Sequence, residues 1–235
     1  MTAITTTHAI PAVLLAAVAP AMAKKDVRYY LNGARLEADP DNSARCTATD
    51  GHAALTAVDR DAHYSGPAVT LPRDFVEAIN KVAKGRGLVE LSIRAWEQKE
   101  GSTTATRHDL WAKVGTVTLT AQDVGGRYPD WQAIMPCGPY TGTAAVDASI
   151  VEVPVKAAKA IKSALEVRKT PAVRLLSRDE NSAVAVVFDL DPKLSLKVAG
   201  VVMPVRPFTS VDPAATWALS YAMPRAPAAE QREAA

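Results

Sequence analysis

Hydrophobic and polar positions recur along this chain in one repeated order. Each recurrence opens with a short β-branched stretch, continues as an apolar stretch with helical spacing, and closes with three stretches of alternating pattern. Alternation and β-branched enrichment predict strands, whereas apolar positions three and four apart predict a helix. The pattern therefore predicts three copies of a strand–helix–three-strand unit, each of about 60–70 residues.

The predicted elements occupy matching places in the three copies. In the first copy, strands are expected at 3–7, 27–37, 44–49 and 53–59, with a helix at 11–23. In the second, strands are expected at 68–71, 88–95, 109–113 and 116–120, with a helix at 72–84. In the third, strands are expected at 150–153, 172–177, 183–189 and 194–202, with a helix at 154–168. Pro72 favours the first turn of its helix, and Gly85 and Gly87 favour its end.

The composition is that of a globular protein with a substantial core. The 235 residues are 48% hydrophobic, and no apolar run is long enough to span a membrane. A net charge of +2 is low for a protein that holds DNA by neutralising many phosphates. Cys46 and Cys137 form no disulfide framework, so we expect two free thiols, Cys46 packed in a strand, and a reducing cytoplasm.

The apolar stretch at 9–23, AIPAVLLAAVAPAMA, has the features of a signal peptide with its cleavage site. Two observations favour a helix of the mature fold instead. Residues 1–8 contain no Lys or Arg, and the basic pair Lys24–Lys25 follows the stretch rather than preceding it.

Motifs for catalysis are absent from the sequence. There is no Gly-rich phosphate loop, no metal-ligand spacing and no nucleophile elbow. The histidines are scattered, at His8, His52, His63 and His108. The sequence therefore predicts a protein that is not an enzyme and that needs no metal or cofactor.

Three segments carry a resemblance to a known family. VRYYLNG at 27–33 with ATDGH at 48–52, GGRYPDWQAIMP at 125–136, and VVMPVR at 201–206 stand in this order. The first two resemble parts of the central domain of the bacterial sliding clamp, the beta subunit of DNA polymerase III, and the last resembles its extreme C-terminus. The match is close only within these segments and loose over the rest of 1–207.

The resemblance implies an α+β DNA-clamp fold of repeated β-α-β-β-β units, with antiparallel sheets outside and helices lining a hole. Residues 1–136 would form a two-unit domain like the central domain, 137–149 a linker, and 150–207 half of the last domain. Independently of the resemblance, the prolines, alanines and charged end of 208–235 predict a flexible tail, and the four-residue spacing of Trp217 and Tyr221 leaves a short docking helix as the alternative. Relative to the family, the first domain and half of the last are missing, as in a shortened phage or mobile-element form. A family ring contains twelve units, so three units per chain would imply four chains, with third units pairing between chains.

In the clamp family, partner proteins insert an extended peptide into a cleft between the central and last domains. Carried over by motif, one wall and its rim would comprise Arg28, Tyr30, Leu31, Thr49, Gly51 and His52. The floor would comprise Pro129 and Ile134, and the opposite side Val201, Met203, Pro204, Val205 and Arg206. Ala53 and Ala133 replace family arginines and Ala54 a usual leucine, so a wider, less polar cleft is expected. Without the resemblance, Asp50–Gly51 is simply a good hairpin turn, His52 a structural histidine and VVMPVR an edge strand.

Basic positions recur on the predicted helices. Lys156, Lys159 and Lys162 fall within an arc of about 120° of the third helix, away from its apolar positions. The full set of residues expected to face DNA is Lys24, Lys25, Arg73, Lys81, Lys84, Lys156, Lys159 and Lys162. A solvated polar face explains each helix equally well. A sliding ring needs only weak contact with the DNA backbone, so the small net charge is compatible with this role.

Two functions remain from the sequence. The first is a cytoplasmic, nucleoid-associated processivity factor that encircles duplex DNA without sequence preference. Its partners would be DNA polymerase, other proteins with clamp-binding motifs, a clamp loader where loading is needed, and further copies of this chain. The alternative is a peptide-binding adaptor or decoy that never closes a ring and competes for the host clamp's clients. An enzyme on an α/β scaffold is a weaker third class, because a catalytic constellation is missing.

Overall fold

The computed structural model describes residues 5–100 and 103–206, so the expected tail at 208–235 lies outside the described residues. The helical segments are α1 (Ala12–Val18), α2 (Arg73–Ala83), α3 (Ala148–Leu165) and the 3₁₀ turns η1 (Ala19–Ala21), η2 (Tyr29–Leu31) and η3 (Gln132–Ile134). The strands are β1 (Thr5–Pro11), β2 (Gly33–Ala38), β3 (Ser43–Thr49), β4 (Ala53–His63), β5 (Val69–Pro72), β6 (Leu88–Glu100), β7 (Thr103–Val114), β8 (Val117–Gln122), β9 (Ala172–Leu176), β10 (Val184–Asp189) and β11 (Leu196–Val202).

The described strands form two antiparallel sheets. One has four strands in the order β1-β6-β7-β8, and the other has seven in the order β5-β2-β3-β4-β11-β10-β9. The first two units exchange their opening strands, because β1 pairs with β6 and β5 pairs with β2. The exchange interlocks units one and two. The predicted α+β class with antiparallel sheets is confirmed.

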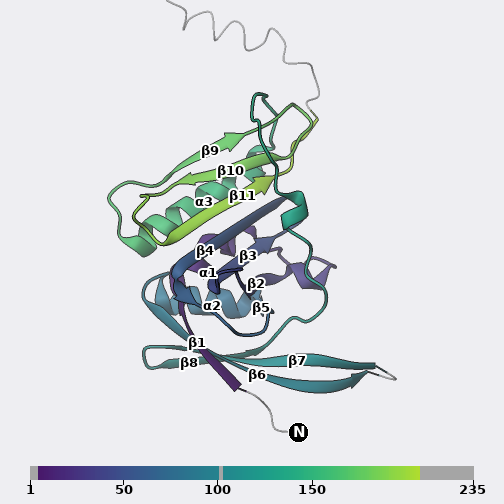
Figure 1. The fold of residues 1–235 in the computed structure, drawn as a ribbon, viewed down its shortest axis with the longest axis vertical. Helices are drawn as coiled ribbons and strands as arrows, with labels where there is room; N and C mark the ends of the chain where they lie inside the picture. The colour runs from purple at the N-terminus through teal and green to yellow at the C-terminus, as the bar shows by residue number, and fades with distance from the viewer. Residues whose placement is uncertain (1–4, 101–102, 207–235) are drawn as a thin grey trace, which may run out of the picture.

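The third unit joins the first through its last strand. β11 pairs with β4 in an unbroken antiparallel register from Leu196↔Asp59 to Val202↔Ala53. Figure 1 shows the sheet running from β5 to β9 past this junction, which we call the seam. The sheet is therefore continuous across the expected domain boundary at 137–149, and the division into domains stays a prediction.

Helix α1 is at the centre of the core. Each of its residues is buried, and it contacts β4, β3, α2 and α3. Figure 1 shows α1 and α2 between the four-stranded sheet and the β2–β5 end of the larger sheet, with α3 against β9–β11. Side chains of the third unit, such as Ile161 and Phe188, belong to the same hydrophobic cluster as those of α1. The small alanines of α1 allow this close packing on several sides.

The expectation of a strand at 27–37 is wrong for the first half of that range. Residues 27–32 form a loop with the turn η2, and Val27 is 95% exposed. Side-chain bonds stabilise the loop: Asn32 Nδ2 donates to the Asp26 carbonyl and Asn32 Oδ1 accepts from the Asp26 N–H, both at 2.9 Å. Such local bonds compete with a sheet ladder. The strand therefore begins only at Gly33.

The opening strand expected at 150–153 is also wrong, because α3 already begins at Ala148. Asp147 caps this helix, its carboxylate accepting a 2.7 Å bond from the Ser149 N–H. Pro154, expected at the start of the helix, lies inside it and is buried. In the first two units the opening strand joins the other unit's sheet. Among the described residues the third unit has no second sheet to join, so this segment continues the helix.

Smaller differences concern lengths and faces. The hairpin of β6 and β7 runs to Glu100 and Thr103, well beyond the expected ends at 95 and 109. Val82 on α2 is 39% exposed, although it is apolar. Both cysteines are free, with Cys46 buried in β3, as predicted. The described helices include none long and apolar enough to cross a membrane.

One buried histidine has a lowered pKa. His8 on β1 is 8% exposed and packs on Tyr64, with ring centroids 4.6 Å apart. Its Nε2 atom has no hydrogen-bond partner among the described residues. Burial lowers the pKa of His8 below its ordinary value of 6.5, and the nearby His63 lowers it further. A charged His8 is therefore disfavoured in the folded state.

We predict that stability falls as the pH drops below about 6.5, the ordinary histidine pKa, because the unfolded chain then binds a proton that folded His8 resists. His8→Phe keeps the ring packing and removes the titration, so urea midpoints at pH 7.5, 6.5 and 5.5 should vary less in this variant. One such group contributes at most about 1.4 kcal/mol per pH unit. Exposed His63→Gln is the control and should keep most of the pH dependence. Equal pH dependence in the parent and His8→Phe would contradict the assignment.

Candidate functional site

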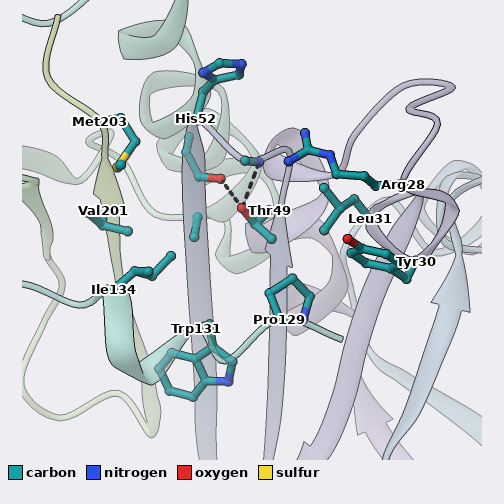
Figure 2. Close-up of a pocket in the computed structure, with 13 residues that line it drawn as sticks. Arg28, Tyr30, Leu31, Thr49, His52, Pro129, Trp131, Ile134, Val201 and Met203 are labelled. Atoms are coloured by element: carbon teal, nitrogen blue, oxygen red, sulfur yellow. Dashed lines mark hydrogen bonds between the residues drawn. The ribbon is translucent and has the colours of Figure 1, made fainter. Parts of the chain in front are cut away.

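The seam carries a cavity of about 200 Å³ in which segments far apart in sequence meet. We call it the seam pocket. Figure 2 shows its lining, which comprises Arg28, Tyr30, Leu31, Thr49, Gly51, His52, Ala53, Ala54, Pro129, Trp131, Ile134, Val201 and Met203. Pro204, Val205 and Arg206, expected in the same site, do not line it. Binding by any of these residues stays a prediction.

The pairing of β4 with β11 sets the shape of the pocket. The N–H of Met203 donates to the His52 carbonyl at 2.8 Å, which extends the ladder one bond past the end of β11. A Cβ on Gly200 would lie 2.3 Å from the Ala54 carbonyl oxygen, so this close approach of the strands requires glycine. Val201 and Met203 consequently form one side of the pocket, facing the β3–β4 turn.

The β3–β4 turn is held by its own side chains. The Thr49 hydroxyl donates to the Ala53 carbonyl at 2.8 Å and accepts from the Gly51 N–H at 3.1 Å. Asp50 Oδ1 accepts from the N–H groups of His52 and Ala53, both at 2.8 Å. Gly51 has φ +91°, which a residue with a side chain rarely adopts. The turn is thus rigid, and the exposed His52 stands at the rim of the pocket.

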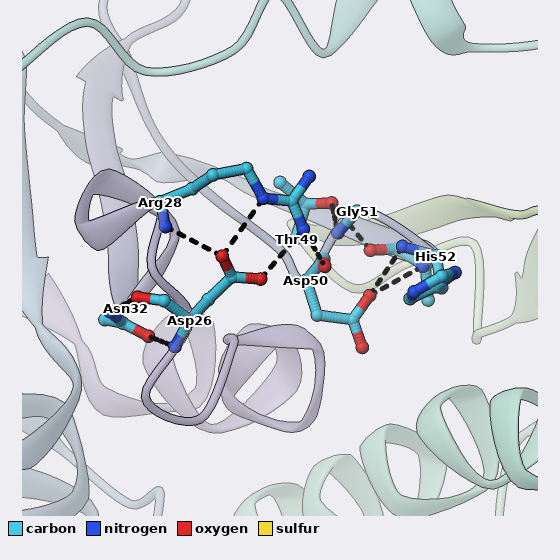
Figure 3. A network of polar contacts seen from close by, with 8 residues as sticks. Asp26, Arg28, Asn32, Thr49, Asp50, Gly51 and His52 are labelled. Carbon is cyan, nitrogen blue, oxygen red and sulfur yellow. Dashed lines mark hydrogen bonds and ion pairs between the residues drawn. The ribbon is translucent and has the colours of Figure 1, made fainter.

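Arg28 joins the η2 loop to this turn. Its guanidinium donates twice to the Asp26 carboxylate, at 2.8 and 3.0 Å, and once to the Asp50 carbonyl at 3.2 Å (Figure 3). This partner holds the pKa of Asp26 at about 2. A Cβ on Gly51 would come within 2.9 Å of the guanidinium nitrogens, so glycine also makes room for Arg28. Arg28 Nη1 carries no hydrogen bond within the described structure and remains available to a ligand.

The floor is fixed by residues that follow β8. The indole N–H of Trp131 donates to Glu37 at 3.1 Å, and the guanidinium of Arg45 lies 4.7 Å above the Trp131 ring. The buried Tyr128 hydroxyl donates to the Thr47 carbonyl at 3.2 Å. These contacts hold the segment against β2 and β3, which positions Pro129 and Ile134 at the pocket. Trp131 was not among the expected site residues, although it stands within the GGRYPDWQAIMP segment.

The C-terminal side departs from expectation because the chain turns away after Met203. Pro204 has no N–H to continue the ladder. The N–H of Val205 instead donates to the Ala145 carbonyl at 2.8 Å, on the segment that precedes α3. Val205 and Arg206 are thereby carried past the pocket. On this side, Val201 and Met203 therefore form the wall of the pocket, and Met203 is 43% exposed.

The pocket suits apolar side chains better than a whole small molecule. Its lining is mainly aliphatic and aromatic, with Arg28 and His52 as the charged or titratable groups at the rim. Small-molecule sites usually enclose about 300–1,000 Å³, so this cavity has room for one or two side chains. Met203, whose side chain is adaptable, and Ile134, which is 41% exposed, border the opening. The arrangement can anchor an extended chain and offers no nucleophile–base pair.

Of the expected DNA-facing residues, Arg73 and Lys81 lie on α2, Lys156, Lys159 and Lys162 on α3, Lys84 caps the end of α2, and Lys24 and Lys25 follow η1. Four of the eight line one hollow. This hollow, about 590 Å³, lies among α1, α2 and α3 and is lined in part by Lys24, Arg73, Lys84 and Lys156. Arg73 is occupied within the protein, donating to the Met22 and Ala23 carbonyls and pairing with Glu77. Lys156 pairs with Glu152. The remaining expected residues, Lys25, Lys81, Lys159 and Lys162, are exposed but do not line the hollow.

Comparison with known proteins agrees with this geometry. Residues 9–130 match the family model of the DNA polymerase III beta subunit, central domain. The beta sliding clamp of Proteus mirabilis is 36% identical over 121 residues, which cover 50% of this chain and 29% of that protein. The clamp of Escherichia coli is 32% identical over 127 residues, covering 54% and 31%. The chain thus spans about a third or less of the length of these curated relatives.

Solved structures extend the likeness in fold to the third unit. The sliding clamp of Pseudomonas aeruginosa aligns with a TM-score of 0.61 at 21% identity, covering 87% of this chain and 66% of that one. The pol III beta of Caulobacter crescentus aligns with a TM-score of 0.63 at 16% identity, covering 86% and 67%. The family model matches just over half of the 235 residues of this chain. The chain therefore belongs to the DNA polymerase III beta-subunit family, the beta sliding clamps.

Proposed function

We propose that this chain is a subunit of a sliding clamp in which several copies enclose duplex DNA and partner proteins dock by an extended peptide in the seam pocket. The partners would include a DNA polymerase and other proteins that carry such a peptide, and a loader where the ring does not open by itself. The protein would act without catalysis, in the cytoplasm with the nucleoid. The observation that carries the proposal is that all three family-like segments contribute to one apolar pocket.

The pocket supports peptide docking because it is already formed. The turn at Thr49–Ala53, the Arg28–Asp26 pair and the Trp131 contacts fix its walls without a ligand. A preformed site avoids the ordering cost that a flexible one incurs on binding. Each apolar side chain that enters gains about 1.5–3 kcal/mol from burial. One or two anchors would therefore be enough for selective, reversible docking.

The helix surface supports loose contact with a DNA backbone. Among the described residues, Lys24, Lys84, Lys159 and Lys162 make no ion pair within 4 Å, so their side chains can contact an outside partner. Glu77 and Glu152 lie among the cations and reduce the local charge. The net charge of the chain is only +2. Few free cations favour weak, non-specific phosphate contacts, which permit sliding.

Open sheet edges support assembly from several chains. Within the described residues, β8 pairs only with β7 and β9 pairs only with β10, so each leaves one edge unpaired. An unpaired edge is a template for another strand. Copies joined at such edges could supply the units that one chain lacks relative to the longer family members. The number of copies in a ring is left to measurement.

We predict that Met203→Ala and Ile134→Ala each weaken peptide docking by about 5- to 30-fold, which corresponds to about 1–2 kcal/mol. Both side chains border the pocket and are about two-fifths exposed, so removing them should leave the fold intact. The probe is a fluorescein-labelled extended peptide with leucine and phenylalanine anchors, followed by fluorescence anisotropy. Val205→Ala is the matched control, since Val205 is similarly exposed but does not line the pocket. Unchanged binding by both pocket variants would rule out this site.

We predict that the double variant Lys159→Glu/Lys162→Glu weakens binding to duplex DNA and flattens its salt dependence. Each lost phosphate contact should reduce the slope of log K against log salt by about 0.9. The control Lys113→Glu/Lys193→Glu changes the net charge equally on exposed residues away from the helices and should bind like the parent. Titration at several salt concentrations checks both.

The same samples test the adaptor alternative. Light scattering of the parent over a range of concentrations should show a discrete oligomer if copies form a ring. A mass of one chain at high concentration, together with unchanged DNA binding in the helix variant, would contradict the clamp and favour an adaptor that only binds peptides.

A further inference from the structure

Exposed apolar side chains gather around the seam pocket. Val27 is 95% exposed, Tyr29 55%, Met203 43%, Ile134 41% and Val205 37%. All belong to segments that line the pocket or adjoin its lining. Exposed large apolar side chains close to a pocket often mark a site that a ligand or partner covers.

The chain itself continues from this surface. The Met203 N–H donates a hydrogen bond to the His52 carbonyl beside the pocket, and the Val205 N–H donates one to the Ala145 carbonyl. The described structure ends at Arg206. Residues 207–235 follow in the sequence. They therefore begin four positions after Met203, the last residue that lines the pocket.

This C-terminal sequence contains one segment with the chemistry that the pocket accepts. Residues 213–223, PAATWALSYAM, carry no charged side chain. Within them, WALSY at 217–221 alternates large apolar residues with small ones. In an extended chain, alternate side chains share a face, so Trp217, Leu219 and Tyr221 would point the same way. At about 3.3 Å per residue the three anchors span about 13 Å.

We propose that the WALSY segment occupies the seam pocket of its own chain as an internal competitor of partner peptides. The inference rests on the proposed function only in that the same pocket also takes partner peptides. The clamp would then bind partners in proportion to their ability to displace this segment. Weak or incidental apolar peptides would be excluded, and peptides with better anchors would be admitted.

The tether makes this occupancy effective even if the segment binds weakly. Arg206 and Trp217 are eleven residues apart, a length of chain that can span at most about 36 Å. Short flexible tethers give effective concentrations in the millimolar range. A segment with an intrinsic Kd near 0.1 mM would therefore occupy the pocket about nine-tenths of the time.

The test compares full-length chains with the fluorescein-labelled leucine–phenylalanine peptide as probe. Trp217→Ala/Leu219→Ala/Tyr221→Ala removes the three anchors, and we expect this variant to bind the probe about 10-fold more tightly than the parent. The matched control, Glu230→Ala/Gln231→Ala/Arg232→Ala, alters the same region without touching the anchors and should bind like the parent. Equal affinity in all three chains, with the probe bound, would overturn the proposal.

A second measurement separates this inference from the proposed function. A free peptide of residues 213–223 is titrated into the anchor-free chain, with and without Met203→Ala. Binding that Met203→Ala weakens by a similar 5- to 30-fold would support the inference even if the probe binds no variant, in which case only the partner-peptide proposal fails. Absence of binding by the free peptide would overturn the inference.

The competitor is expected to act within one chain. The difference in probe affinity between the parent and the anchor-free variant should be the same at 1 and 100 μM protein. A difference that grows with protein concentration would assign the segment to the pocket of a second copy and overturn the proposal as stated.

Discussion

The antiparallel pairing of β4 with β11 is the interaction on which the rest of this structure depends. It continues the sheet of the first unit into the third, and it brings Val201 and Met203 opposite the β3–β4 turn. Without it, the third unit would be one helix and three strands, too small to bury a sufficient core alone. The shared cluster of α1 and α3 side chains would open as well. Fold and pocket thus rest on the same ladder of backbone bonds.

Around the pocket, polar contacts fix the positions of loops more than they stabilise the fold. The Arg28–Asp26 pair is open to solvent, and ion pairs of this kind contribute little to stability. Its effect is to hold the η2 loop beside Gly51, just as the Trp131–Glu37 bond holds the floor. Ala53 and Ala54 then leave space that larger side chains would fill. The pocket is therefore defined by where backbone segments are fixed, and its walls are mostly small or apolar.

The sequence could predict features that repeat or that depend on local chemistry. Alternating pattern located most strands, and the three family-like segments located most of the pocket lining. The sequence could not show that β1 and β5 exchange sheets, because the residue pattern of a strand does not specify which strand it pairs with. Three of the four residues at 150–153 are β-branched, and the segment was expected to be a strand. It lacks the second sheet that such a strand would join and lies within α3 instead. Trp131 lines the pocket and Val205 does not. The sequence could not show this, because their hydrogen-bond partners Glu37 and Ala145 are distant in sequence.

The two strands that pair at the seam are synthesised far apart in time. β4 is complete by His63, whereas β11 begins only at Leu196. At about 5–20 residues per second, the β4 edge and the neighbouring apolar surface wait on the order of ten seconds for their partner strand. During that interval the nascent chain presents an unpaired edge, which is prone to mispairing and to capture by chaperones. The pocket comes into existence only when this last strand arrives, so a chain that has stalled or misfolded upstream has no site with which to recruit a partner.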